Sequence, residues 1–237
     1  MRATPALVLA LACLALTGCE TTQEKSAKLE RTHRKGAVAS KGLTIAQANP
    51  DIKVLSATAV HTSEGTAVVV TVANSGSAQR EIPLLVSVKQ TGGSPISNSE
   101  AGLAHSLTSI AYVPSHGKAV WVDDQLTLIG KPGAATAKVG EGKKAKGSVP
   151  KVELGTHKLE KESDEEVVTG TVTNGSSVPQ HELVVYATAT QGSRTIAAGR
   201  AVITSLAAGA KSKFQIFLIG APATSAHLTV SAPPSTF

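Results

Sequence analysis

A strand-and-turn pattern that occurs twice in the sequence restricts this chain to folds built from β-strands. The sequence TVAN at residues 71–74 recurs as TVTN at residues 171–174, 100 positions later. In the run before the first asparagine, two sets of small and β-branched residues fall on opposite faces of a strand: Val68, Val70 and Val72, and Val69, Thr71 and Ala73. Asparagine followed by serine and glycine then favours a turn.

Further matches follow in the same order along both copies. They pair residues 84–86 with 184–186, Gly92 with Gly192, 101–102 with 198–199, and 113–121 with 206–214. The offset falls from 100 to 93, as loop deletions would produce. This shared order predicts two copies of one β-module, over residues 51–129 and 152–233. Short strands at 8–12-residue spacing favour a β-sandwich for each copy.

The two copies each place one aromatic residue at the corresponding point of a late strand. Trp121 is the single tryptophan of the chain, and Phe214 occupies its place in the second copy. Large aromatic side chains contribute much of the apolar area that a small core can bury. We therefore expect Trp121 and Phe214 to point inward, among valine, leucine and isoleucine side chains.

Two polar stretches flank the first module. Residues 19–50 are polar and of mixed charge, without apolar periodicity, and are expected to form a disordered tether. Residues 130–151 are rich in glycine and alanine and carry six lysines against Glu141. This composition predicts an interdomain linker that does not fold. In such a linker Lys143, Lys144 and Lys146 would be open to trypsin.

The first nineteen residues have the pattern of a secretory signal peptide. Arg2 precedes an apolar run of eleven residues, 6–16, which is shorter than the roughly 20 residues needed to span a bilayer. The run ends in Leu16-Thr17-Gly18-Cys19, which resembles the lipobox of bacterial lipoproteins. The alternatives are an ordinary signal peptide in which Cys19 occurs by chance, or a buried signal anchor.

The lipobox resemblance implies cleavage after residue 18 and a thioether-linked diacylglycerol on Cys19. Two or more acyl chains anchor a protein stably, whereas one holds it only marginally. The resemblance places the mature protein outside the cytoplasm, attached to a membrane through the lipid on Cys19. Which membrane carries it is left open. Cys13, the other cysteine, would leave with the signal peptide, so no disulfide is expected.

The second copy also resembles a known module. Its strand and turn at 169–177, its next strand at 181–190, and the segments LAAG at 206–209 and FQIF at 214–217 resemble the FxLYD-type module of bacterial surface lipoproteins. The resemblance covers residues 152–232, and residues 51–129 more loosely. It implies an all-β chain of two tandem immunoglobulin-like β-sandwiches. The first copy departs from the pattern at Val70, where the family has glycine, and at residues 121–124.

Residues able to carry chemistry are few and scattered. The seven histidines show no metal-ligand spacing, and no nucleophile elbow or phosphate-binding loop occurs. The acidic clusters, Asp123-Asp124 and residues 164–166, have no calcium-binding pattern around them. We therefore expect no catalytic residues, no metal and no cofactor. A Ser-His-Asp site assembled from distant strands is the one enzymatic alternative that the sequence leaves open.

These features favour a lipid-anchored, extracytoplasmic protein of the cell envelope that acts as a non-catalytic binding, scaffold or adhesion module. The first alternative is an accessory lipoprotein of an envelope transport or assembly complex, and the second is a hydrolase. The net charge of +6 suits anionic envelope polymers, and a protein partner is the other possibility. With only six aromatic residues and an exported chain, nucleic acid is not expected as a partner.

Overall fold

The computed structural model describes residues 42–162, 165–222 and 225–237. Apart from one helix of four residues, every regular element in them is a β-strand, so the prediction of an all-β sandwich architecture is confirmed. No helix among the described residues is long and apolar enough to cross a membrane. The lipobox residues Leu16, Thr17, Gly18 and Cys19 lie outside the described residues, so the signal peptide and residues 19–41 of the tether stay predictions. The end of the predicted tether is wrong, because Asn49 is buried and its side-chain amide donates to Gln79 and to the carbonyl of Gly140.

The N-terminal half forms two antiparallel sheets that face each other. Its elements are β1 (Ile52–Thr62), β2 (Gly65–Asn74), β3 (Gln79–Gln90), β4 (Gly93–Ser97), α2 (His105–Thr108), β5 (Ser109–Val113), β6 (Lys118–Leu126), β7 (Pro132–Val139) and β8 (Lys143–Lys144). One sheet has the order β1-β2-β6. In the other sheet, β3 pairs with β4, β5, β7 and β8 along its length.

The C-terminal half repeats this arrangement. Its strands are β9 (Val152–Glu162), β10 (Glu165–Asn174), β11 (Gln180–Gln191), β12 (Arg194–Leu206), β13 (Lys211–Phe217), β14 (Ile219–Gly220) and β15 (His227–Ser231). One sheet has the order β13-β10-β9 and the other β14-β12-β11-β15. The long strand β12 pairs with β11, as β4 and β5 both pair with β3 in the first half. In the first half, residues 98–108, which include α2, separate the two short strands.

The asparagine turn that defines the repeat has the same hydrogen bonds in both halves. Asn74 and Asn174 are buried, and each side-chain amide donates to a carbonyl of the following turn, at 2.8 Å to Ser77 and 2.9 Å to Val178. In each case Oδ1 accepts the backbone N–H two residues later. An asparagine suits this position in both halves because its one side chain both donates to a turn carbonyl and accepts a turn N–H, where these groups are shielded from water.

The predicted linker is wrong over most of its length. Within residues 130–151, β7 pairs with β3 from Leu84 opposite Val139 to Gln90 opposite Pro132, and β15 pairs with β11 in the equivalent place. Ala135, Ala137 and Val139 pack on the core while the residues between them are exposed, so β7 has the alternation of a strand. Alanine side chains fill the inner face of β7, and this small-residue composition is also typical of linkers.

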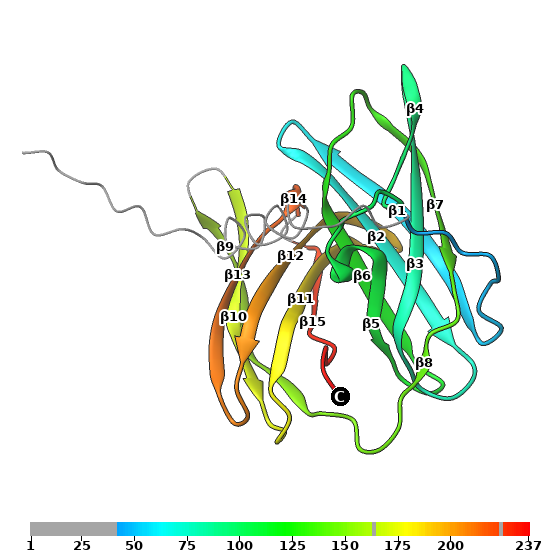
Figure 1. Cartoon of the computed structure of the whole chain (residues 1–237). Helices are drawn as coiled ribbons and strands as arrows, with labels where there is room; N and C mark the ends of the chain where they lie inside the picture. The colour runs from blue at the N-terminus through cyan, green and yellow to red at the C-terminus, as the bar shows by residue number, and fades with distance from the viewer. Residues whose placement is uncertain (1–41, 163–164, 223–224) are drawn as a thin grey trace, which may run out of the picture.

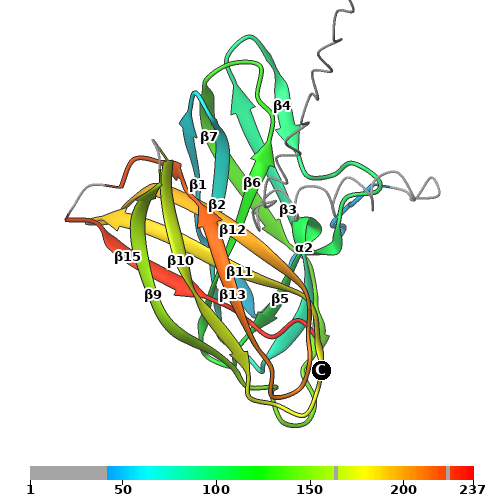
Figure 2. The ribbon, with the colours of Figure 1, turned by 90° about the vertical axis from the view of Figure 1, so that its left-hand side faces the viewer.

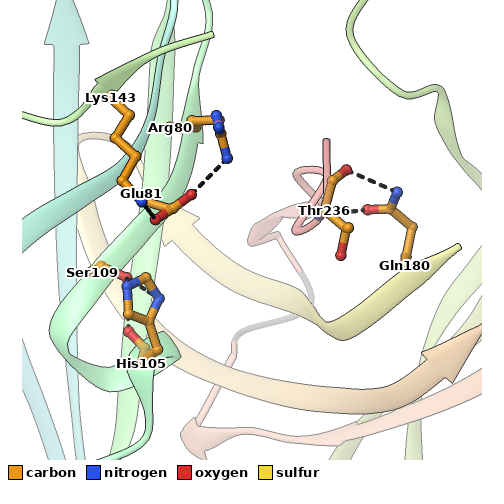
Figure 3. Close-up of polar contacts among 7 residues, drawn as sticks. All are labelled: Arg80, Glu81, His105, Ser109, Lys143, Gln180 and Thr236. Carbon is orange, nitrogen blue, oxygen red and sulfur yellow. Dashed lines mark hydrogen bonds and ion pairs between the residues drawn. The ribbon is translucent and has the colours of Figure 1, made fainter. Parts of the chain in front are cut away.

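The chain between the halves is correspondingly short. β8 is fixed against the start of β3, where Lys143 Nζ lies 2.6 Å from Glu81 Oε2 and Arg80 approaches Oε1 of the same carboxylate (Figure 3). These partners, Lys143 above all, lower the pKa of Glu81. Beyond β8, residues 146–149 are exposed. This stretch, rather than residues 130–151, is the connection between the two sandwiches.

The four sheets stack as four layers (Figure 1). Sheet β1-β2-β6 contacts sheet β14-β12-β11-β15, and each of them also covers the other sheet of its own half. One hydrophobic core therefore contains residues of both halves, such as Val70 and Trp121 from the first with Val184, Ala198 and Val202 from the second. The two sandwiches meet face to face over this shared core.

The sequences of the central strands explain why they are covered on both sides. Residues 66–70 of β2, 183–189 of β11 and 197–203 of β12 are buried without alternation. A strand with one wet face alternates apolar and polar residues, whereas a strand covered on both faces is apolar throughout. In β11, Leu183 and Val185 enter the core of the second half while Val184 and Tyr186 enter the shared core.

Candidate functional site

The most unusual feature of the described residues is an ion pair buried between the two central sheets. Arg200 lies on β12 and Asp124 on β6, with side chains 1% and 3% exposed. The Asp124 carboxylate accepts the backbone N–H of Arg200 at 3.0 Å, and its other oxygen lies 3.9 Å from Arg200 Nε. Each half of the molecule therefore contributes one charge to the interface between them.

A third element joins this pair. The Arg200 guanidinium donates to the carbonyl of Ser106 on α2 at 3.5 Å and to its hydroxyl at 3.3 Å. The same carbonyl accepts the indole N–H of Trp121 at 2.8 Å. Residues 98–108, which separate β4 from β5 in the first half, thus provide Ser106 as a polar partner for Arg200 of the second half.

Burial shifts the pKa values of these groups in the directions that desolvation requires. Loss of water raises the pKa of Asp124 to about 7, and neighbouring Asp123 adds to the increase. Burial lowers the pKa of Arg200 to about 9, which leaves the guanidinium protonated at neutral pH. The pKa of Tyr186 on β11 is raised as well, by burial first and then by the two aspartates.

The charged cluster of Asp124, Arg200 and Ser106 can determine how the two central sheets pack against each other. A buried ion pair costs desolvation energy, yet removing one partner leaves an uncompensated charge and is strongly destabilising. If the two sheets packed in another relative position, Arg200 would be buried without Asp124 and Ser106. The cost of such an unpaired buried charge favours the observed position. We infer that the cluster fixes how the two sandwiches meet.

The C-terminal tail forms a second contact between the halves. The side chain of Gln180 accepts the backbone N–H of Ser235 at 2.9 Å and of Thr236 at 3.1 Å. Figure 3 shows the contact between Gln180 and Thr236. From there the tail reaches the first half, where the ring of Phe237 lies 5.5 Å from that of Tyr112. The guanidinium of Arg80 lies over the Phe237 ring at 5.5 Å, in cation–π geometry.

The structure places the two expected aromatic residues in the interior. Trp121 is fully buried, opposite Val70 of β2, and Phe214 is 3% exposed. Phe214 lies opposite Gly170 of β10, where a Cβ atom would come within 2.5 Å of the ring. Trp121 belongs to the shared core and Phe214 to the core of the second half, so the structure does not bring them together.

Sequence reasoning missed the ion pair. In the sequence, the pair Asp123-Asp124 suggests only a cation-binding cluster. Within the described ranges no group of three or more histidine, cysteine or acidic side chains is arranged to hold a metal. Arg200 carried the available signal, because it is the one charged residue in the apolar run 196–203. A lone arginine in such a run predicts a buried cation, which requires a partner.

Comparison with known proteins does not assign a family. No family model matches the chain, and no curated protein matches it.

Proposed function

We propose that this chain is a lipid-anchored protein of the cell envelope with a non-catalytic binding or scaffold role. The observation that carries the proposal is the sequence Leu16-Thr17-Gly18-Cys19 at the end of an eleven-residue apolar run. A diacylglycerol on Cys19 would attach the mature chain to a membrane, and the polar residues that follow would space the folded part from the bilayer.

The folded part supports a binding role by its construction. Four stacked sheets, a shared core and a buried ion pair hold two sandwiches in a fixed relation, as a scaffold requires. The outer face of sheet β13-β10-β9 carries exposed side chains of both signs, such as Lys158, Lys213 and Glu162. The chain's net charge of +6 comes mainly from the lysines and arginines of residues 20–50 and 130–151, and these segments suit anionic envelope polymers as ligands.

The anchor is tested by replacing Cys19 with alanine and following the chain in membrane and soluble fractions. We expect the variant to leave the membrane fraction or to accumulate uncleaved, and to lose labelling by a fatty-acid precursor. Cys13→Ala is the matched control, since it removes a cysteine of the same signal peptide and should be processed like the wild type. Wild-type fractionation and processing of Cys19→Ala would refute the anchor.

A role as accessory subunit of an envelope complex is the second candidate. It is favoured by the open edges of the sheet β13-β10-β9, since an edge strand presents backbone groups to which a partner strand can bind. Crosslinking in native membranes followed by purification of the anchored chain distinguishes the two roles. A complex role requires a stoichiometric protein partner, whereas polymer binding requires retention of the envelope polymer.

A further inference from the structure

Strand β9 is the longest open edge of the outermost sheet of the second half (Figure 2). It runs for eleven residues, and in the part of the chain that the structure describes β10 is the only strand that pairs with it. Residues 156–159, 161 and 162 are exposed along this edge. Its outward backbone N–H and C=O groups are therefore available for another strand.

The two residues next to Leu159 on this edge carry opposite charges. Lys158 and Glu160 flank it, and their side chains already meet within one chain, at 2.6 Å. In an antiparallel pair of identical strands centred on residue 159, position 158 of one copy stands opposite position 160 of the other. Both such pairs would be lysine with glutamate, so residues 158–160 are complementary to themselves, while the next positions would place His157 opposite Lys161.

Leu159, at the centre of this pairing, is the exposed large apolar side chain of β9. Leu159 is 36% exposed and is one of four large apolar side chains that the described residues leave exposed. In the antiparallel register it meets its own copy. The two leucines would then cover each other, while the lysine–glutamate pairs lie on either side.

We propose that a second copy of this chain binds here, with β9 pairing antiparallel to β9 around Leu159. The contact joins two three-stranded sheets into one of six strands and is isologous, as most homodimer interfaces are. Because one strand edge buries less surface than a standard interface, the dimer is of weak affinity in solution. This proposal rests on the exposed edge and its charges, and does not depend on the lipid anchor.

The register is tested by disulfide trapping with Leu159→Cys in the full chain under mild oxidation. Residues directly opposite each other in an antiparallel pair have Cβ atoms about 4.5–5.5 Å apart, near enough for a disulfide after a small adjustment. The parent chain controls for the native cysteines. Glu153→Cys, on the same strand, controls for random collision, because the two copies of that residue would lie about 40 Å apart.

We expect a covalent dimer from Leu159→Cys and none above the parent level from Glu153→Cys. Equal dimer yields from the two variants, or none from Leu159→Cys, would overturn the proposal. A disulfide adduct of Leu159→Cys with a different protein would overturn it too, because the edge would then belong to another partner.

Charge exchange provides an independent test by sedimentation of the full chain over a range of concentrations. Lys158→Glu places like charges opposite each other twice and should weaken self-association about tenfold. The double variant Lys158→Glu/Glu160→Lys restores opposite charges and should return the association constant to the wild-type range. Failure of the double variant to recover, with far-UV circular dichroism unchanged, would contradict the β9 register.

Discussion

At about pH 8, where both Asp124 and Arg200 are mostly charged, replacing Arg200 with alanine is expected to lower the free energy of unfolding by about 3–5 kcal/mol, because it leaves the Asp124 carboxylate buried without its cation. The variant also removes the donors to Ser106 on α2. Urea unfolding monitored by circular dichroism measures the loss. Arg194→Ala is the matched control, since Arg194 lies on the same strand and is exposed, and it should change stability by less than about 0.5 kcal/mol.

A double variant separates the ion pair from simple loss of packing. If Arg200 matters as the partner of Asp124, then Arg200→Met with Asp124→Leu should be more stable than Arg200→Met alone, because no unpaired charge remains in the interface. A loss below about 1 kcal/mol for Arg200→Ala, the size of an ordinary exposed ion pair, would show that the pair is not buried in solution.

Replacing Trp121 with alanine is expected to cost about 3–5 kcal/mol, since it removes a fully buried side chain and leaves a cavity in the shared core. It also leaves the Ser106 carbonyl without the indole donor. Trp121→Phe keeps much of the apolar volume and should cost less. Because Trp121 is the single tryptophan, its fluorescence reports this one position.

The wild-type emission provides the check on that prediction. A buried indole in an apolar core emits at shorter wavelength than one in water, and we expect the short-wavelength spectrum in the folded chain. Emission typical of a water-exposed indole, or a Trp121→Ala variant as stable as the wild type, would contradict the inward position.

The strands of the second half were predictable because strong local signals coincide there. The predicted strand and turn at residues 169–177 are confirmed by β10 and the Asn174 turn, and the offset repeat relates them to β2 and the Asn74 turn of the first half. Local patterns failed at β7, where alanine, glycine and lysine replace the expected β-branched residues. There the pairing with β3 determines the strand, and the repeat with β15 was the signal that could have found it.

The stacking of the two halves was less accessible from the sequence. Uninterrupted apolar runs in β2, β11 and β12 indicate burial on both faces, but they do not say which sheet covers which. The Asp124–Arg200 contact joins residues 76 positions apart, and Ser106 of α2 contacts both Trp121 and Arg200 only in the folded chain. Such long-range polar contacts follow from tertiary structure and have no local pattern.

The shared core and the ion pair imply that the two sandwiches form one body, and cutting the connection between them tests this most directly. A protease recognition sequence inserted between Lys146 and Gly147 lies in an exposed stretch, where insertion and cleavage should be tolerated. After cleavage, the two halves should run separately under denaturing conditions yet elute together in native gel filtration. Separate elution of two folded halves would contradict the account, because the interface would then not hold without the covalent connection.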